Sequence, residues 1–145
     1  MKTLLIVAVA IVLIAAGYSV AQGVPDLKGR WSGTFRTVIY GQNPHHPGSQ
    51  TISSPPRIRS IRFTFDIEGH DGRLLWGKSW SNPAQKEPFA ATLTSDGNTI
   101  IGADTDGLLA VRILSRSRIE VCYAHSALSP SRSIVASCGI VGRSR

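Results

Sequence analysis

Histidine, serine and acidic side chains are the first residues to consider as catalytic groups. His70 precedes Asp71 in a segment typical of a hairpin turn, where aspartate serves the turn geometry. His125 ends a candidate strand close to Ser126 and Ser129. A hydrolase with His70 or His125 as general base stays an alternative, but spatial geometry and not sequence order defines a catalytic triad. The sequence lacks GxSxG, HExxH and phosphate-binding glycine motifs, so we predict no enzymatic activity.

Two adjacent histidines suggest a metal site. His45 and His46 lie at the centre of residues 41–57, a connection rich in proline and glycine that fits neither a strand nor a helix. Adjacent residues seldom bind one ion together, and no third ligand lies nearby in the sequence. We therefore predict no metal and no cofactor. The connection is expected to form a lid over a binding site or a surface loop.

Aromatic residues and one lysine form the best candidate for ligand binding. The candidate set comprises Trp76, Trp80, Lys78, Phe63, Phe65 and Tyr123. The first three alternate along one stretch and would share one face of a strand. An aromatic wall with a few polar groups suits a small apolar or planar ligand, and Lys78 could bind an anionic group. The alternative is that the rings only fill a solid core, with Lys78 at its rim.

Alternation of apolar and polar residues predicts an all-β protein. Within residues 58–68, Ile61, Phe63, Phe65 and Ile67 would point one way and the polar residues the other. The expected strands span residues 30–39, 59–68, 73–80, 88–94, 99–104, 108–114, 118–125 and 133–141. No stretch after the first 21 residues has helical periodicity with capping residues.

Asp-Gly pairs predict the positions of three hairpin turns, because a tight turn needs positive φ, which glycine adopts easily. These pairs are Asp71-Gly72, Asp96-Gly97 and Asp106-Gly107. The resulting neighbours would be Ile67 with Trp76, Leu93 with Ile100, Gly102 with Val111 and, across a three-residue turn at 115–117, Val111 with Val121 and Leu109 with Tyr123. One apolar face would then run through four successive strands.

Only two cysteines are present, Cys122 and Cys138. A hairpin in which they face each other centres on Pro130, inside a turn-like segment. We therefore predict a disulfide between them on the outer wall of the sheet. A metal or redox pair is the alternative, but the spacing is not CxxC.

Eight sequential strands with short connections and one apolar face predict an eight-stranded up-and-down antiparallel barrel, since closing the sheet removes both edges. A β-sandwich is the alternative architecture.

The start of the first strand resembles a known superfamily. Residues 27–31, Leu-Lys-Gly-Arg-Trp, resemble the Gly-x-Trp opening of the calycins, the lipocalins and avidins, and residues 71–77 are loosely similar to an avidin-type hairpin. The number of predicted strands and the length of the chain after residue 21 resemble those of the avidins. The resemblance implies a structural role for Trp31 at the closed end of the barrel. The polar set that binds biotin in avidins is not found here, so the resemblance implies the architecture without biotin binding.

Residues 1–21 are typical of a secretory signal peptide. Lys2 precedes an apolar run from Leu4 to Ala16, and small residues at Ser19 and Ala21 place the cleavage before Gln22. An uncleaved anchor is the alternative. We expect residues 22–145 to form a single barrel domain with its Pro/Gly/His-rich loop at 41–57. The location would be secreted or periplasmic, and the chain would not span a membrane after cleavage.

The chain is basic, with 16 Lys and Arg against 9 Asp and Glu and a formal charge of +7. The basic residues form no long run, so no specific nucleic-acid binding is expected. We predict an exported, non-catalytic binding protein for a small apolar or planar ligand. The alternative is an envelope-associated interaction or inhibitor protein whose basic outer surface binds an acidic protein or polysaccharide.

Overall fold

The computed structural model describes residues 25–42, 47–126 and 132–144. The predicted signal peptide and both histidines of the His45-His46 pair lie outside these residues. Eight strands follow one another along the chain: β1 (Gly29–Gln42), β2 (Arg57–Asp71), β3 (Leu74–Trp80), β4 (Glu87–Leu93), β5 (Thr99–Ala103), β6 (Leu108–Ser115), β7 (Arg118–His125) and β8 (Arg132–Arg143). The described residues contain no helix, and hence none long and apolar enough to cross a membrane.

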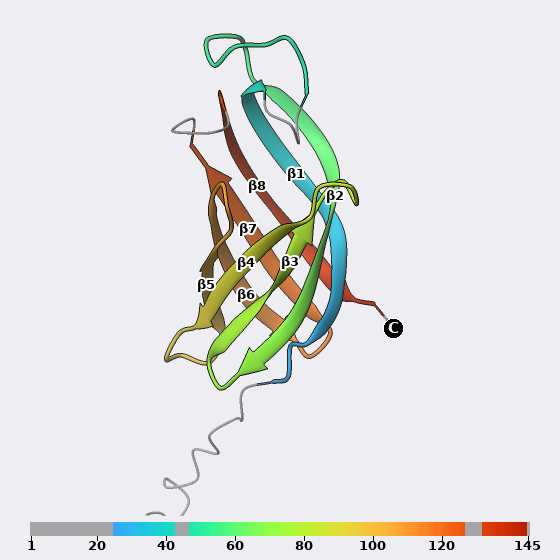
Figure 1. The fold of residues 1–145 in the computed structure, drawn as a ribbon, viewed down its shortest axis with the longest axis vertical. Helices are drawn as coiled ribbons and strands as arrows, with labels where there is room; N and C mark the ends of the chain where they lie inside the picture. Colours follow the sequence, from blue (N-terminus) through green and yellow to red (C-terminus); the bar gives the residue numbers. More distant parts are fainter. Residues whose placement is uncertain (1–24, 43–46, 127–131, 145) are drawn as a thin grey trace, which may run out of the picture.

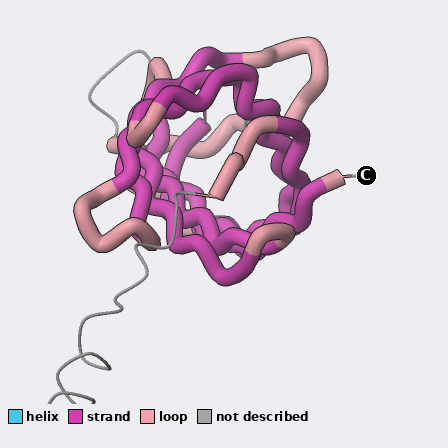
Figure 2. Tube along the Cα trace, turned by 90° about the horizontal axis from the view of Figure 1, so that it is seen from below, coloured by secondary structure: helices cyan, strands magenta, loops and turns pink. Residues whose placement is uncertain are grey.

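The strands close into one antiparallel barrel in the order β1 to β8, with β8 paired back to β1 (Figures 1 and 2). The predicted up-and-down barrel is confirmed, and the sandwich alternative is wrong. Odd-numbered strands end, and even-numbered strands begin, at one end of the barrel, which we call the mouth. The opposite end, where the first strand begins, is the base.

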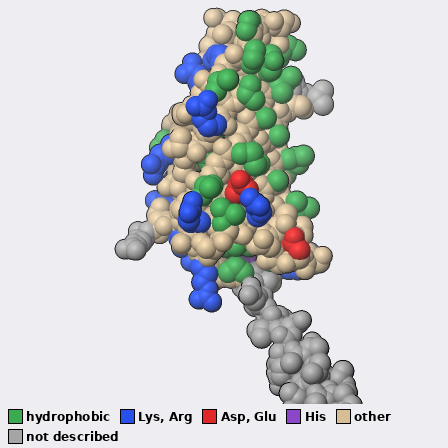
Figure 3. Space-filling view, turned by 180° about the vertical axis from the view of Figure 1, so that it is seen from behind, with side chains coloured by type: hydrophobic (Ala, Val, Ile, Leu, Met, Phe, Trp, Pro, Cys, Tyr) green, Lys and Arg blue, Asp and Glu red, His purple; other side chains and the backbone are tan. Residues whose placement is uncertain are grey.

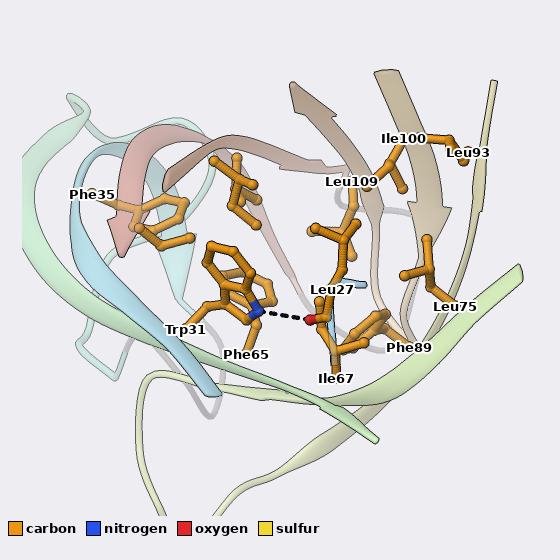
Figure 4. Close-up of a cluster of buried hydrophobic side chains, with 13 residues drawn as sticks. Leu27, Trp31, Phe35, Phe65, Ile67, Leu75, Phe89, Leu93, Ile100 and Leu109 are labelled. Atoms are coloured by element: carbon orange, nitrogen blue, oxygen red, sulfur yellow. Dashed lines mark hydrogen bonds between the residues drawn. The ribbon is translucent and has the colours of Figure 1, made fainter. Parts of the chain in front are cut away.

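Side chains alternate between the barrel interior and its outer wall, as a pleated strand requires. On β1, Trp31, Phe35, Thr37 and Ile39 are buried while Arg36 and Val38 between them are exposed. Buried apolar residues from all eight strands form one core cluster, part of which Figure 4 shows. Because the sheet is closed, the inward side chains of the eight strands pack against one another, and the first and last strands pair with each other instead of forming two open edges.

The hairpin registers agree with the sequence in part. Leu93 faces Ile100, Val111 faces Val121 and Leu109 faces Tyr123, as predicted. The β5–β6 register is different, because Gly102 faces Leu109 and not Val111. Four residues, 104–107, form this turn, and the Asp104 side chain accepts hydrogen bonds from the backbone N–H groups of residues 106 and 107. The two-residue shift preserves which face each side chain occupies.

The predicted β2–β3 register is wrong. Ile67 faces Gly77 instead of Trp76, and Trp76 faces Gly69. Asp71 pairs with Leu74, so the turn lies at Gly72 and Arg73 and moves the register by two residues. A β-bulge between Ile67 and Gly69 adds one residue to β2 and moves the register back by one. Because a one-residue slip reverses the side-chain faces, Leu75 and Gly77 point inward and Trp76 points outward.

The base is closed by the segment that precedes β1 (Figure 2). Leu27 and Trp31 are completely buried, and Trp31 Nε1 donates a hydrogen bond to the Leu27 carbonyl oxygen at 2.9 Å (Figure 4). The Arg143 guanidinium lies over the Trp31 ring, 4.8 Å from its centroid. His70 lies beside this segment, with Nδ1 3.4 Å from the Leu27 amide nitrogen. Trp31 therefore joins the segment that precedes β1 to the end of β8 at the base.

The predicted disulfide is confirmed. Cys122 on β7 faces Cys138 on β8, and their sulfurs are bonded. Cys138 is exposed, and inward-pointing residues flank both cysteines along their strands, so the bond lies on the outer wall as expected.

Candidate ligand site at the barrel mouth

Buried polar side chains gather in the mouth half of the barrel. The buried polar residues among those described are Thr37, Ser79, His125, Ser133 and Ser137. They lie toward the mouth ends of β1, β3, β7 and β8, whereas the base half is filled by aliphatic residues and Trp31. Polar groups in a barrel interior need hydrogen-bond partners, so this half is suited to a polar occupant.

A cleft opens at the mouth, between the turns 81–86 and 104–107. Its lining consists of Phe35, Phe63, Phe65, Ser79, Trp80, Ser81, Gln85, Glu87, Asp104, Asp106, Leu109, Tyr123 and His125. The enclosed part has a volume of about 30 Å³, which is room for a single water molecule. A larger ligand would therefore lie across the mouth and insert only an edge or one substituent.

Phenylalanines form the floor of the cleft. The ring centroids of Phe35 and Phe63 are 5.0 Å apart, and those of Phe63 and Phe65 are 6.4 Å apart. Phe89 packs edge-on against Phe65 below them. Such tilted and offset arrangements are favourable for aromatic pairs. The floor is thus a fixed apolar surface against which a planar group can pack.

A chain of hydrogen-bonding side chains runs along one wall of the cleft. The Tyr123 hydroxyl lies 3.4 Å from Asp104 Oδ1 and 3.2 Å from His125 Nδ1. The other ring nitrogen, His125 Nε2, lies 2.8 Å from Ser133 Oγ. Tyr123 and His125 project inward from β7, while Asp104 is fixed by the turn after β5. These contacts hold the polar wall in one arrangement.

The cleft lining includes three carboxylate residues, Glu87, Asp104 and Asp106, although the chain as a whole is basic. Burial raises the pKa of Tyr123 strongly above its ordinary value, and the negative charges of Asp104, Asp106 and Glu87 raise it further. Gln85 Oε1 is buried in the same cleft and has no hydrogen-bond partner among the described residues. The rim is therefore rich in hydrogen-bond acceptors and in negative charge.

Four of the six predicted ligand-binding residues line this cleft. Phe63 and Phe65 contribute to its floor, Tyr123 to its wall and Trp80 to its rim. The Trp80 ring also contacts two cations, since Lys86 Nζ lies 4.7 Å and the Arg30 guanidinium 5.7 Å from its centroid.

Trp76 and Lys78 lie elsewhere, on the outer wall. Trp76 is 47% exposed and packs over Gly69, where an added Cβ would come within 1.9 Å of the indole. Lys78 Nζ lies 3.6 Å from Glu68 Oε1 at the surface. The structure therefore does not bring these two residues to the cleft, because the bulge in β2 places their face of β3 outside. Trp80 lies on the same face but reaches the rim because it is the last residue of β3, at the mouth.

His125, one of the two histidines considered for catalysis, contacts a buried serine, and the other, His70, lies at the base. His125 does lie within hydrogen-bond distance of Ser133, but Ser133 is 0% exposed, so a substrate cannot reach its hydroxyl in this arrangement. His70 is at the base, with Nε2 3.0 Å from the Gly72 carbonyl oxygen and Nδ1 3.7 Å from Asp26 Oδ1. Neither arrangement presents a serine nucleophile to solvent.

A second void of about 30 Å³ lies deeper in the core and is bounded only by apolar side chains, including Phe65, Leu75, Phe89 and Val121. The interior below the cleft is otherwise packed with side chains. An eight-stranded barrel is just wide enough for its own side chains or one small ligand, and here the side chains occupy that space.

No protein family and no curated protein matches the chain. Among solved structures, the chain is similar to a redesigned β-barrel, with 9% identity and a TM-score of 0.47, over 88% of this chain and 99% of that one.

Proposed function

We propose that this protein is a non-catalytic binding protein that holds a small planar ligand at the mouth of its barrel. The observation that carries the proposal is the cleft itself, with a phenylalanine floor and a polar wall at one end of a barrel whose base is closed. Concave sites with apolar walls and a few fixed polar groups are the usual form of small-molecule sites. The ligand would pack its flat face on Phe63 and present polar atoms to the rim.

The rim favours a ligand that donates hydrogen bonds or carries positive charge. Glu87, Asp104 and Asp106 supply carboxylates, and Gln85 supplies a buried amide oxygen with no partner among the described residues. An anionic ligand would meet repulsion from these groups. Lys78, on which the prediction of an anionic ligand depended, lies outside the cleft beside Glu68. An amine- or amidine-bearing aromatic compound fits this rim best.

The ligand would remain partly exposed, because the enclosed space of about 30 Å³ admits no whole aromatic ring. Partial burial of one ring on the phenylalanine floor would give affinities in the micromolar to millimolar range, about −4 to −8 kcal/mol. This is the behaviour of a recognition site and not of an enclosed carrier.

We further propose that the chain is exported and belongs among the calycins. The disulfide supports an oxidising compartment, and the closed barrel with Trp31 buried at its base supports the superfamily relationship. Sequencing the N-terminus of the protein purified from the outside of the producing cell tests the export. A mature N-terminus at Gln22 is expected, and a chain retained inside the cell with Met1 intact would contradict it.

Calorimetric titration with two matched aromatic compounds tests the binding site. Tryptamine and indole-3-acetate share the indole ring but carry opposite charges. We expect tryptamine to bind about tenfold more tightly or better, since one neighbouring charge is worth about 1 kcal/mol or more near a surface. Asp106→Asn removes one of the three rim carboxylates and should reduce this preference measurably, whereas Asp71→Asn removes one negative charge at the base, far from the cleft, and should leave it unchanged.

Two outcomes would contradict the proposal. Equal affinity for the two compounds in the wild type would show that the rim does not select charge. Binding unchanged in both Asp106→Asn and Phe63→Ala would show that the compounds bind elsewhere.

A further inference from the structure

Strand β2 extends beyond β3 at the mouth of the barrel. The last pair between these two strands is Thr64 with Trp80, where β3 ends. Residues 57–63 of β2 therefore pair with β1 on one side and with no described strand on the other (Figure 1). No backbone hydrogen bond joins residues 57–63 to any other described part of the chain. This side of β2 is a free strand edge, to which a further strand can be added.

The strand pairing shows which backbone groups this edge offers. Successive residues of a paired strand direct their N–H and C=O groups to opposite sides. The Ser144 amide donates to the Arg30 carbonyl oxygen, so the even-numbered residues of β1 bond toward β8 and the odd-numbered residues toward β2. Odd-numbered residues of β1 face odd-numbered residues of β2 without a register shift. The N–H and C=O groups that point away from β1 are therefore those of Ile58, Ser60 and Arg62.

The side chains along the free edge are open to solvent. Arg59, Ser60 and Arg62 are exposed, and Ile58 is 67% exposed. The distance along the strand from Ile58 to Arg62 is about 13 Å, at about 3.3 Å per residue. A peptide strand of about five residues would match this length.

Arginines without acidic partners lie along the same edge. Arg36 and Arg62 project from the outer face of the sheet, and Arg59 projects from the opposite face. None of these three has an ion pair within the described ranges, whereas Arg30, farther toward the base, pairs with Asp66 at 2.9 Å. Figure 3 shows most Lys and Arg side chains along one side of the molecule. The free edge is therefore positively charged.

We propose that residues 57–63 bind an acidic peptide segment in an extended conformation, which adds a strand to β2 beyond the end of β3. Main-chain hydrogen bonds to Ile58, Ser60 and Arg62 would hold the segment, as in other complexes formed by strand addition. Its carboxylates would lie beside Arg59 and Arg62, and an apolar side chain would pack on Ile58. The partner is thus a protein with an exposed, acidic and extended segment.

Charge separates this partner from the other possible occupants. A second copy of the chain would place its own arginines opposite Arg59 and Arg62, and like charges directly across a strand pair are unfavourable. The acidic segment would also be repelled from the mouth cleft, whose lining includes the carboxylates of Glu87, Asp104 and Asp106. The free edge is therefore a second site, which selects the opposite charge from the ligand cleft.

Nuclear magnetic resonance of the nitrogen-15-labelled mature protein tests the proposal. The probe is a capped peptide of four Glu-Val repeats, and its control is a capped peptide of four Lys-Val repeats, which differs in the sign of its charge. We expect the Glu-Val peptide to bind about tenfold more tightly or better, because its charges lie beside those of the arginines. At saturation the amides of Ile58, Ser60 and Arg62 should exchange with deuterium about fivefold more slowly or better, while those of Arg59 and Ile61, already bonded to β1, should not change.

Two pairs of variants separate strand addition from simple charge attraction. Ser60→Pro removes the N–H at the middle of the free edge, where an edge strand accommodates proline, and Ser60→Ala is its matched control. Arg62→Gln removes one charge at the edge, and Arg116→Gln removes one from the exposed turn between β6 and β7 at the base. We expect Ser60→Pro to weaken binding about fivefold or more and Arg62→Gln about threefold. Both controls should stay within about twofold, and thermal unfolding checks that all four variants are folded.

Three outcomes would overturn the proposal. The first is equal affinity for the two peptides. The second is a saturated complex in which none of the Ile58, Ser60 and Arg62 amides gains protection, because the peptide would then bind without adding a strand; this result decides even if Ser60→Pro does not fold. The third is a set of peptide-induced shifts centred on Trp80 and Tyr123, which would place the peptide in the mouth cleft. Binding of tryptamine at the cleft is measured separately and is unaffected by any of these results.

Discussion

Truncation of Trp31 is the most informative test of how the barrel is closed. The indole is completely buried at the base, its Nε1 donates to the Leu27 carbonyl oxygen, and Arg143 lies over its face. Trp31→Ala would remove both contacts and leave a cavity between the segment that precedes β1 and the end of β8. Trp31→Phe would keep an aromatic ring and remove only the hydrogen bond and part of the volume.

The expected loss of unfolding free energy follows from these contacts. Replacing a buried Trp by Ala costs about 3–5 kcal/mol, to which the unpaired Leu27 carbonyl adds about 1 kcal/mol. A domain of this size has a total stability of about 5–15 kcal/mol. We therefore expect Trp31→Ala to lose about 4–6 kcal/mol and to be close to unfolded, and Trp31→Phe to lose about 2 kcal/mol.

Urea denaturation followed by far-ultraviolet circular dichroism measures these differences, with Trp76→Ala as the matched control. Trp76 is the same residue type, but it lies half-exposed on the outer wall over Gly69. Its truncation should cost about 1 kcal/mol, as for a partly exposed contact. A loss in Trp31→Ala no larger than that in Trp76→Ala would refute the view that the base is closed by the Trp31 contacts.

Three further predictions concern the wall, the sheet and one turn. Cys122→Ala together with Cys138→Ala should lower the unfolding free energy by about 3 kcal/mol, because the bond closes a loop between residues 16 apart; a urea midpoint unchanged by the double substitution would contradict this. Gly77→Ala should cost about 3 kcal/mol in the same assay, since its Cβ would lie 2.0 Å from the backbone oxygen of Asp66, and a variant as stable as the wild type would refute the clash. Hydrogen bonds from the Thr94 hydroxyl first, and then from the turn amides, hold the pKa of Asp96 well below its ordinary value. A lowered carboxyl pKa stabilises the fold above the ordinary pKa of about 4 and loses that effect as pH falls below it. Asp96→Asn should therefore be less stable than the wild type at pH 7 and equal to it in strong acid, and a difference independent of pH would be inconsistent with this cause.

Strand positions and the barrel could be predicted from the sequence because both depend on local patterns. Apolar alternation marks each strand, and Gly97 has the positive φ predicted for the Asp96-Gly97 turn. Gly72 also has a positive φ, but its turn is displaced by one residue because Asp71 pairs with Leu74. The disulfide was predictable for the same reason, since two cysteines at symmetric positions about one turn must face each other. Errors of one or two residues at strand ends do not change this result.

The outward position of Trp76 could not be predicted from alternation alone. The bulge in β2 adds a single residue, and every side chain beyond it changes face. Gly69 was the available signal, because a glycine inside a strand often marks a bulge or a close approach. Trp76 packs directly over it, which the alternating pattern of β3 by itself does not reveal.

The polar wall of the mouth depends on contacts between distant segments. Asp104 lies in the turn between β5 and β6, Tyr123 on β7 and Ser133 on β8. The β6–β7 and β7–β8 registers bring these residues around His125. The sequence identifies the aromatic floor, since Phe63 and Phe65 follow the strand period. It does not identify the carboxylate rim, because Asp104 and Asp106 read as ordinary turn residues.

The central claim is that ligands bind at the mouth, and one nuclear magnetic resonance titration tests it most directly. The chain has three tryptophans, and they report on three places: Trp80 on the mouth, Trp31 on the base and Trp76 on the outer wall. On titration of the nitrogen-15-labelled protein with tryptamine, we predict that the indole N–H signal of Trp80 shifts with saturation, together with the amide of Tyr123, while those of Trp31 and Trp76 stay in place. A Trp80 signal that does not move, or a larger shift at Trp31 or Trp76, would contradict a ligand site at the mouth.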